Sequence, residues 1–221
     1  KVHQYLTQLD QYLPSVREGT HLQSLLDQCM YFAMSLGRVG ADFRALLPPL
    51  FERSIRLLFT SSLDNVLARF KRSMNMPGDE VYFEWEATPS SYTGRLNPSK
   101  YDPPPGLIVF RPLAVLTNET LVVFNEMRHC AAISLLTALE HYYYEEFLPT
   151  MVEQVKQAYE REKENFNSTK QHQESKQFMR ATAEMLIPYL DQTFRHLIHR
   201  SSRCPIQHLK EKILECIEGE N

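Results

Sequence analysis

Apolar residues recur at helical spacing along most of this chain, and the only long interruption is a proline-rich stretch at residues 75–106. Spacings of three and four residues place apolar side chains on one face of an α-helix. No convincing run of alternating apolar and polar residues accompanies them, so a sheet is not predicted. The sequence therefore predicts an all-α protein with one long loop.

The first 74 residues contain three helical patterns with recognisable ends. Pro14 ends the first pattern, and Thr20 is a suitable N-cap for the second. We expect Gly37 to close the second helix in the left-handed conformation. Pro48–Pro49 fits the first turn of the third helix, which should run to about Met74.

Residues 107–221 repeat this character without repeating the sequence. After Pro112 an apolar stripe continues for about seven turns to Ala138, and Pro149 starts or kinks the next helix. A further helix is expected to kink near Pro188, and the last one follows Pro205. The prediction is an elongated helical bundle or rod of about seven helices, divided into a first bundle (1–74), a long loop or disordered insertion (75–106) and a second bundle (107–221).

Composition excludes several classes of function. The net charge is −3 with a pI near 6.3, which offers no basic footprint for nucleic acid. No run approaches the ~20 apolar residues that span a bilayer, and the four scattered cysteines suggest no disulfide framework. We expect a cytosolic protein without a cofactor. Because the chain starts without Met and already in helical periodicity, we expect a segment of a longer polypeptide.

Enzyme chemistry has one weak candidate in the sequence. His196, His199 and Cys204 could approach one zinc ion, with Glu184 or Asp191 as acid or base. The fourth ligand is missing, and no nucleophile, phosphate-loop or dinucleotide motif is present. We therefore expect no metal site and no catalysis, and keep a metal-dependent helical enzyme as an alternative.

Gly37 and Gly40 bracket a turn that could expose amides to a phosphate, but capping explains both glycines and Asp42 would repel an anion. Asp42 should cap the following turn or pair with Arg38 or Arg44. We interpret Gly37, Gly40, Asp42 and Arg44 as a structural helix junction.

Aromatic residues supply the candidate partner contacts. Tyr142, Tyr143 and Tyr144 are consecutive, so they cannot all face one core, and packing and a protein interface remain alternatives. Trp85 lies in the proline-rich stretch, which is either a disordered insertion or a segment that docks on a partner.

Two runs in the first part of the chain carry a family resemblance: Asp27-Gln28-Cys29-Met30-Tyr31-Phe32 and Arg38-Val39-Gly40-Ala41-Asp42-Phe43-Arg44. Weaker support comes from residues 113–130 and from Ile187-Pro188-Tyr189-Leu190. With these runs the chain resembles the subunit-eight family of the conserved oligomeric Golgi complex, within the helical-rod (CATCHR) tether superfamily. Another helical-rod tether subunit or a helical adaptor is the alternative.

The resemblance implies a non-catalytic subunit of a vesicle-tethering complex that serves intra-Golgi retrograde transport on the cytosolic face of the Golgi. It implies the other subunits of the complex as partners, with SNAREs, Rab GTPases and golgins as further candidates. It also implies that this segment is the carboxy-terminal rod portion, peripheral to the membrane, and that the amino-terminal region is missing.

Overall fold

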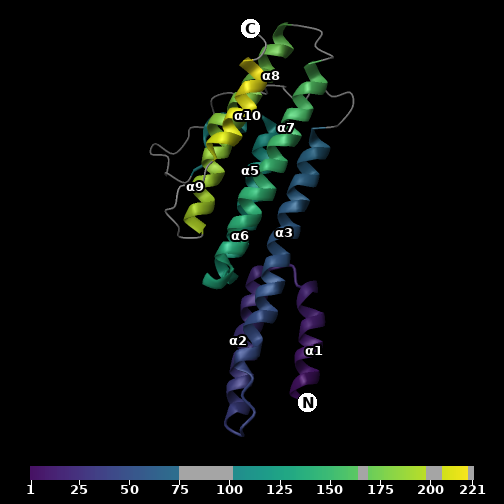
Figure 1. Ribbon diagram of the computed structural model, residues 1–221, viewed down its shortest axis with the longest axis vertical. Helices are drawn as coiled ribbons and strands as arrows, with labels where there is room; N and C mark the ends of the chain where they lie inside the picture. The colour runs from purple at the N-terminus through teal and green to yellow at the C-terminus, as the bar shows by residue number, and fades with distance from the viewer. Residues whose placement is uncertain (75–101, 164–168, 198–205, 219–221) are drawn as a thin grey trace. The chain divides into compact units, whose positions relative to one another are not determined.

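The computed structural model describes residues 1–74, 102–163, 169–197 and 206–218 (Figure 1). Secondary structure within these ranges is helical, with no strand, so the predicted all-α class is confirmed. The described chain forms two compact units, each built from two stretches. Unit 1 comprises residues 1–64 and 122–142, and unit 2 comprises residues 65–121 and 143–221.

The amino-terminal elements are α1 (Val2–Tyr12), the 3-10 turn η1 (Leu13–Ser15), α2 (Gly19–Gly37), the 3-10 turn η2 (Arg44–Leu46) and α3 (Leu47–Ser73). Pro14 falls in η1, immediately after α1, as the sequence predicts. Pro48 and Pro49 occupy the first turn of α3, where their missing amide donors leave no helical hydrogen bond unmade. The division of the chain into bundles 1–74 and 107–221 stays a prediction.

The second half of the chain carries the remaining elements, which are α4 (Pro105–Ile108), α5 (Arg111–Cys130), the 3-10 turn η4 (Ile133–Leu135), α6 (Leu136–Tyr142), the π turn η5 (Tyr143–Phe147), α7 (Leu148–Lys163), α8 (Thr169–Ala181), the π turn η6 (Thr182–Leu186), α9 (Ile187–Leu197) and α10 (Gln207–Glu218). The predicted unbroken helix to Ala138 is wrong, because α5 ends at Cys130 and Ala132 is extended, with a ψ of 153°. Pro105 and Gly106, which the sequence places in the long loop, already belong to α4.

Both π turns precede a proline. η5 is followed by Pro149 and η6 by Pro188, in each case with one residue between the turn and the proline. A proline inside a helix lacks an N–H, and its ring collides with the carbonyl four residues back. A wider π turn relieves that collision while the chain stays helical. Pro149 and Pro188 therefore modify their helices without ending them.

The start of α2 is set by α5. The N–H of Gly19 donates to Glu126 Oε2 at 2.8 Å, and no side-chain hydrogen bond caps this end within α2. A Cβ at position 19 would overlap the Glu126 carbonyl oxygen and lie 3.0 Å from Cys130 Sγ. The expectation that Thr20 caps this helix is wrong, because a carboxylate 107 residues away satisfies the exposed amide instead.

Candidate interaction surface

Three aromatic rings in unit 1 hold α1, α2 and the following connection together. Tyr5 lies 5.5 Å from Phe32 and 5.7 Å from Phe43 between ring centroids, and Phe32 lies 6.0 Å from Phe43. All three pairs meet edge to face, the favourable arrangement for aromatic quadrupoles. This ring cluster fixes the carboxy-terminal half of α2 against its neighbours.

Tyr5 adds a polar contact beneath the rings. Its hydroxyl lies 3.1 Å from the sulfur of Cys29, a buried residue of α2. Burial, and then the hydrogen bond with Cys29, raise the pKa of the Tyr5 phenol to about 12. The phenol therefore stays protonated at neutral pH and remains available as a hydrogen-bond donor.

Around the ring cluster, which includes the partly exposed Phe32, α2 and the residues after it expose apolar side chains. The exposed fraction is 70% for Tyr31, 45% for Phe32, 42% for Met34 and 77% for Val39. We call these four residues the α2 face. The buried residues Leu22, Cys29 and Ala33 lie on the side of the helix opposite Tyr31, whereas Phe32 lies nearer to them. An α2 face of this kind, presented by a helix whose other side is packed, is typical of a surface that contacts another protein.

The α2 face ends at a helix C-cap whose left-handed residue is Gly40. The N–H of Ala41 donates to the carbonyl of Leu36 at 3.1 Å, and the N–H of Gly40 donates to the carbonyl of Gly37 at 3.1 Å. These two bonds form a Schellman motif, with Gly40 at a φ of 81°. The expectation that Gly37 takes the left-handed conformation is wrong, because the helical turn continues through Arg38, with a φ of −63°.

Asp42 and Arg44 close the connection between α2 and α3. Asp42 Oδ1 accepts the backbone N–H of Arg44 at 3.0 Å, and Arg44 Nη2 donates to Asp42 Oδ2 at 2.7 Å. The side-chain bonds from Arg44 hold the pKa of Asp42 below its usual range. A Cβ on Gly37 would lie 3.3 Å from the Asp42 Cβ, so Asp42 would have to shift by a few tenths of an ångström. Assignment of a purely structural role to the four predicted junction residues stays a prediction.

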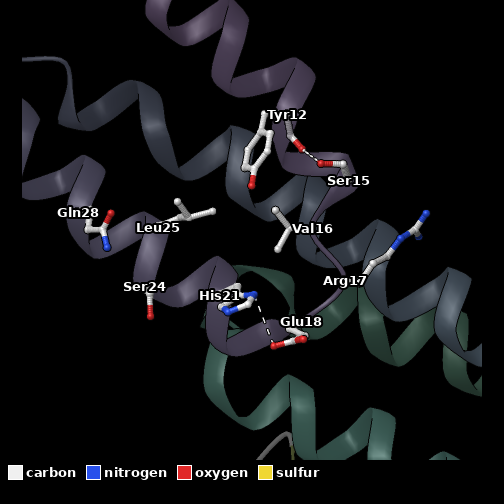
Figure 2. A pocket seen from close by; sticks show the side chains of 9 residues that line it. All are labelled: Tyr12, Ser15, Val16, Arg17, Glu18, His21, Ser24, Leu25 and Gln28. Atoms are coloured by element: carbon white, nitrogen blue, oxygen red, sulfur yellow. Dashed lines mark hydrogen bonds and ion pairs between the residues drawn. The ribbon is translucent and has the colours of Figure 1, made fainter.

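A pocket of about 470 Å³ lies between the end of α1 and the start of α2 (Figure 2). It is lined by Tyr12, Ser15, Val16, Arg17, Glu18, His21, Ser24, Leu25 and Gln28. Figure 2 shows Tyr12, Val16 and Leu25 facing the same space, while His21 pairs with Glu18 at 3.5 Å. The pocket combines apolar walls with a polar edge.

The consecutive tyrosines have different surroundings. Tyr142 belongs to unit 1, where its hydroxyl donates to Asp64 and its ring lies 6.1 Å from Phe59. Tyr143 and Tyr144 are buried in unit 2, with exposed fractions of 0% and 8%. Both side chains therefore pack in the core of unit 2. Partner contact by any tyrosine of this group stays a prediction, and Trp85 lies outside the described residues.

The zinc candidate is not brought together in the described part of the chain. His196 lies in α9, whereas His199 and Cys204 fall outside the described residues. Residues 1–74, 102–163, 169–197 and 206–218 contain no cluster of three or more His, Cys, Asp or Glu side chains suited to a metal ion. Across those same ranges, every helix is too short or too polar to cross a membrane.

Sequence reasoning missed the exposure of the α2 face. It treated Tyr31 and Phe32 as part of a family motif and looked for partner contacts elsewhere. The helical spacing held a usable signal, because Tyr31 and Met34 are three residues apart and lie away from the stripe of Leu22, Cys29 and Ala33.

Known proteins match both the amino-terminal stretch and much of the whole chain. The Dor1-like family matches residues 1–68, which include the α2 face. Subunit 8 of the conserved oligomeric Golgi complex from Mus musculus is 33% identical over 182 residues, covering 81% of this chain and 28% of the relative. The Homo sapiens subunit is 32% identical over 186 residues, covering 81% and 29%. No solved structure matches the chain.

A third relative matches a shorter part of the chain. Subunit 8 from Drosophila melanogaster is 40% identical over 118 residues, covering 52% of this chain and 20% of the relative. The chain spans less than a third of the length of each of these relatives. The chain carries the Dor1-like segment and matches the mouse and human subunits over 81% of its length. It therefore belongs to the family of conserved oligomeric Golgi complex subunit 8.

Proposed function

We propose that this chain is part of a subunit of a Golgi vesicle-tethering complex and acts there as a non-catalytic protein-interaction scaffold. The observation that carries the proposal is the α2 face within the Dor1-like segment. Its apolar side chains are exposed, and the ring cluster beside them holds their helix rigidly. A rigid surface loses little conformational entropy when it binds, so more of its contact energy becomes affinity.

The partners proposed for this surface are the other subunits of the tethering complex. Relatives named as a subunit of the conserved oligomeric Golgi complex support this choice. Through the assembled complex the chain would serve intra-Golgi retrograde transport on the cytosolic face of the Golgi, peripheral to the membrane. SNAREs, Rab GTPases and golgins are proposed as more distant partners.

Scaffold action requires no chemistry from the chain. Long helices bury one face and present another, and several weak contacts along a complex add through multivalency. The junction of Gly37, Gly40, Asp42 and Arg44 is proposed to hold the α2 face at a fixed position relative to α3. The charge-assisted bonds between Asp42 and Arg44 support this role, because they order the connection locally.

The test is a pull-down from cytosol with the full 221-residue chain as bait, followed by mass spectrometry of the retained proteins. We expect subunits of the Golgi tethering complex among them. A double variant, Tyr31→Ser with Met34→Ser, should lose them, since each exposed hot-spot side chain contributes about 2 kcal/mol, or about thirtyfold in Kd. Its melting temperature should stay close to that of the parent, because neither side chain is buried.

The matched control is Ile133→Ser, because Ile133 is 89% exposed but lies outside the α2 face. This variant should retain the same subunits as the parent. If the double variant still retained the tether subunits, the α2 face would not be the binding surface. Absence of every Golgi tether subunit from the parent pull-down would contradict the scaffold function of this segment.

A further inference from the structure

A charged residue lies inside the aromatic core of unit 2. Asp191, in α9, is 1% exposed. Its Oδ1 accepts the hydroxyl of Tyr144 at 2.8 Å, and its Oδ2 accepts Nη2 of Arg195 one helical turn later. The Arg195 side chain is 31% exposed and reaches toward water. These three residues form a buried polar network that joins η5 to α9 across 47 positions of sequence.

Aromatic rings surround this network. Tyr143 stacks on Phe194 with a centroid separation of 4.0 Å and an interplanar angle of 23°, and on Phe147 at 5.5 Å and 21°. Tyr144 meets the same Phe194 edge to face at 5.7 Å. The adjacent residues Tyr143 and Tyr144 of the π turn η5 are both buried. Phe194 thus contacts two rings of η5, whose centroids lie 5.0 Å from each other.

The helix α9 buries a wide face. Its buried positions include three consecutive residues, Tyr189, Leu190 and Asp191, in addition to Ile187 and Phe194. A helix with so wide a buried face could turn about its axis and still cover most of its apolar surface. Rings also accept several offset arrangements of similar energy.

The carboxylate removes that freedom. An uncompensated buried charge costs several kcal/mol, so a rotation that separates Asp191 from its partners is strongly disfavoured. The paired charges add little net stability, because their desolvation offsets most of their attraction. The best-attested use of such a buried polar group is to select one packing register over others.

We propose that the Tyr144–Asp191–Arg195 network sets the rotational register of α9 against η5, and thereby the stacking of Tyr143 on Phe194. The network specifies which packing forms and contributes little to how stable it is. Removing all three polar groups therefore leaves a helical protein whose tyrosine core no longer has a single arrangement.

The test uses the full chain with Tyr144→Phe, Asp191→Leu and Arg195→Met combined, and with ¹³C-labelled tyrosine. In the parent we expect the ring current of Phe194 to shift the Tyr143 signal, which should appear as one sharp line. We expect the triple variant to keep its far-UV circular dichroism and its melting temperature. The Tyr143 line should split or broaden, and the variant should bind the dye ANS, as loosely packed cores do.

A single variant gives a second, milder test. Tyr144→Phe keeps the ring and removes only the hydroxyl that ties η5 to Asp191, so we expect a folded protein with a broadened Tyr143 line. The matched control is Tyr189→Phe, which removes the hydroxyl of another buried tyrosine in α9 and should leave that line sharp.

Three results would overturn the proposal. A sharp, shifted Tyr143 line in the triple variant would mean that apolar packing alone defines the register. An unchanged Tyr143 line in Tyr144→Phe would mean that the Tyr144 hydroxyl does not define the register. A triple variant that loses its far-UV signal or melts well below the parent would mean that the network stabilises the fold and does not only select its packing.

Discussion

Unit 1 and unit 2 treat apolar side chains differently. Unit 1 exposes many of them in the described residues: Tyr12, Tyr31, Phe32, Met34, Val39, Leu46, Leu57, Val122 and Ile133. The described part of unit 2 exposes Ile108, Val115 and Met185. Unit 2 instead buries its rings around Phe194 and ties them with Asp191.

This difference separates two tasks. Unit 2 uses its aromatic residues to hold its own helices together, so these side chains have no free surface to offer. Unit 1 fixes α2 with a few rings and leaves Tyr31 and Met34 of the same helix exposed. Proteins rarely expose grouped apolar side chains without a partner that covers them. We therefore propose that unit 1 carries the binding surface.

Truncation of the aromatic core should give the largest effect and should separate the units most clearly. Phe194→Ala removes a fully buried ring from unit 2, and we expect a loss of about 3–5 kcal/mol. Phe32→Ala in unit 1 should cost only about 1 kcal/mol, since nearly half of that side chain already contacts water. Denaturant unfolding measures both values. Equal losses would contradict the contrast between a sealed core and a partly open one.

Gly19→Ala should be the next largest effect, and it belongs to unit 1. The new methyl group would overlap the Glu126 carbonyl oxygen, so α2 and α5 must separate, at a cost of about 1–3 kcal/mol. Thr20→Ala, at the exposed neighbouring position, should change stability by less than about 0.5 kcal/mol. Thermal melting of the two variants checks the difference. A larger loss for Thr20→Ala would mean that its side chain caps α2 after all.

Gly40→Ala tests whether the end of the α2 face is structural. A Cβ there has open space, but a φ of 81° costs a residue with a side chain about 1–2 kcal/mol. Gly40→Asn should lose less stability than Gly40→Ala, because Asn tolerates the left-handed region. Both variants should bind partners as the parent does when folded. If Gly40→Val kept its melting temperature but no longer assembled with its partners, the structural role of Gly40 would be contradicted.

The smallest effect concerns pH and the ring cluster. The folded state raises the pKa of Tyr5 from 10 to about 12, so it holds that proton more tightly than the unfolded state does. The stabilising contribution is complete below pH 10 and disappears as the pH rises to 12. The parent should therefore lose stability over this range more steeply than Tyr5→Phe. If the melting temperatures of the two proteins fell equally between pH 10 and pH 12, Tyr5 would make no such contribution.

Helical periodicity predicted the class and many helix positions because it reports which side chains face a core. Pro14 and the pair Pro48–Pro49 marked real boundaries, since proline restricts the backbone locally. The break after Cys130 was missed because Ala131 and Ala132 carry no comparable restriction. Pro149 and Pro188 were noticed, but sequence alone did not reveal that a π turn accommodates each of them.

Long-range contacts account for the other failures. The bond from Gly19 to Glu126 joins residues that no local pattern connects. Local rules also failed between Gly37 and Gly40, where either glycine could have taken the left-handed position. The three tyrosines were ambiguous because their burial depends on which helices lie opposite, and the sequence does not state that.

Photo-crosslinking in the purified Golgi tethering complex tests the assignment of binding to unit 1 most directly. A photoreactive phenylalanine derivative replaces Tyr31 in one protein and Val115, an exposed apolar residue of unit 2, in another. The account predicts crosslinks to other subunits from position 31 and none from position 115. Crosslinks from position 115 alone would contradict it.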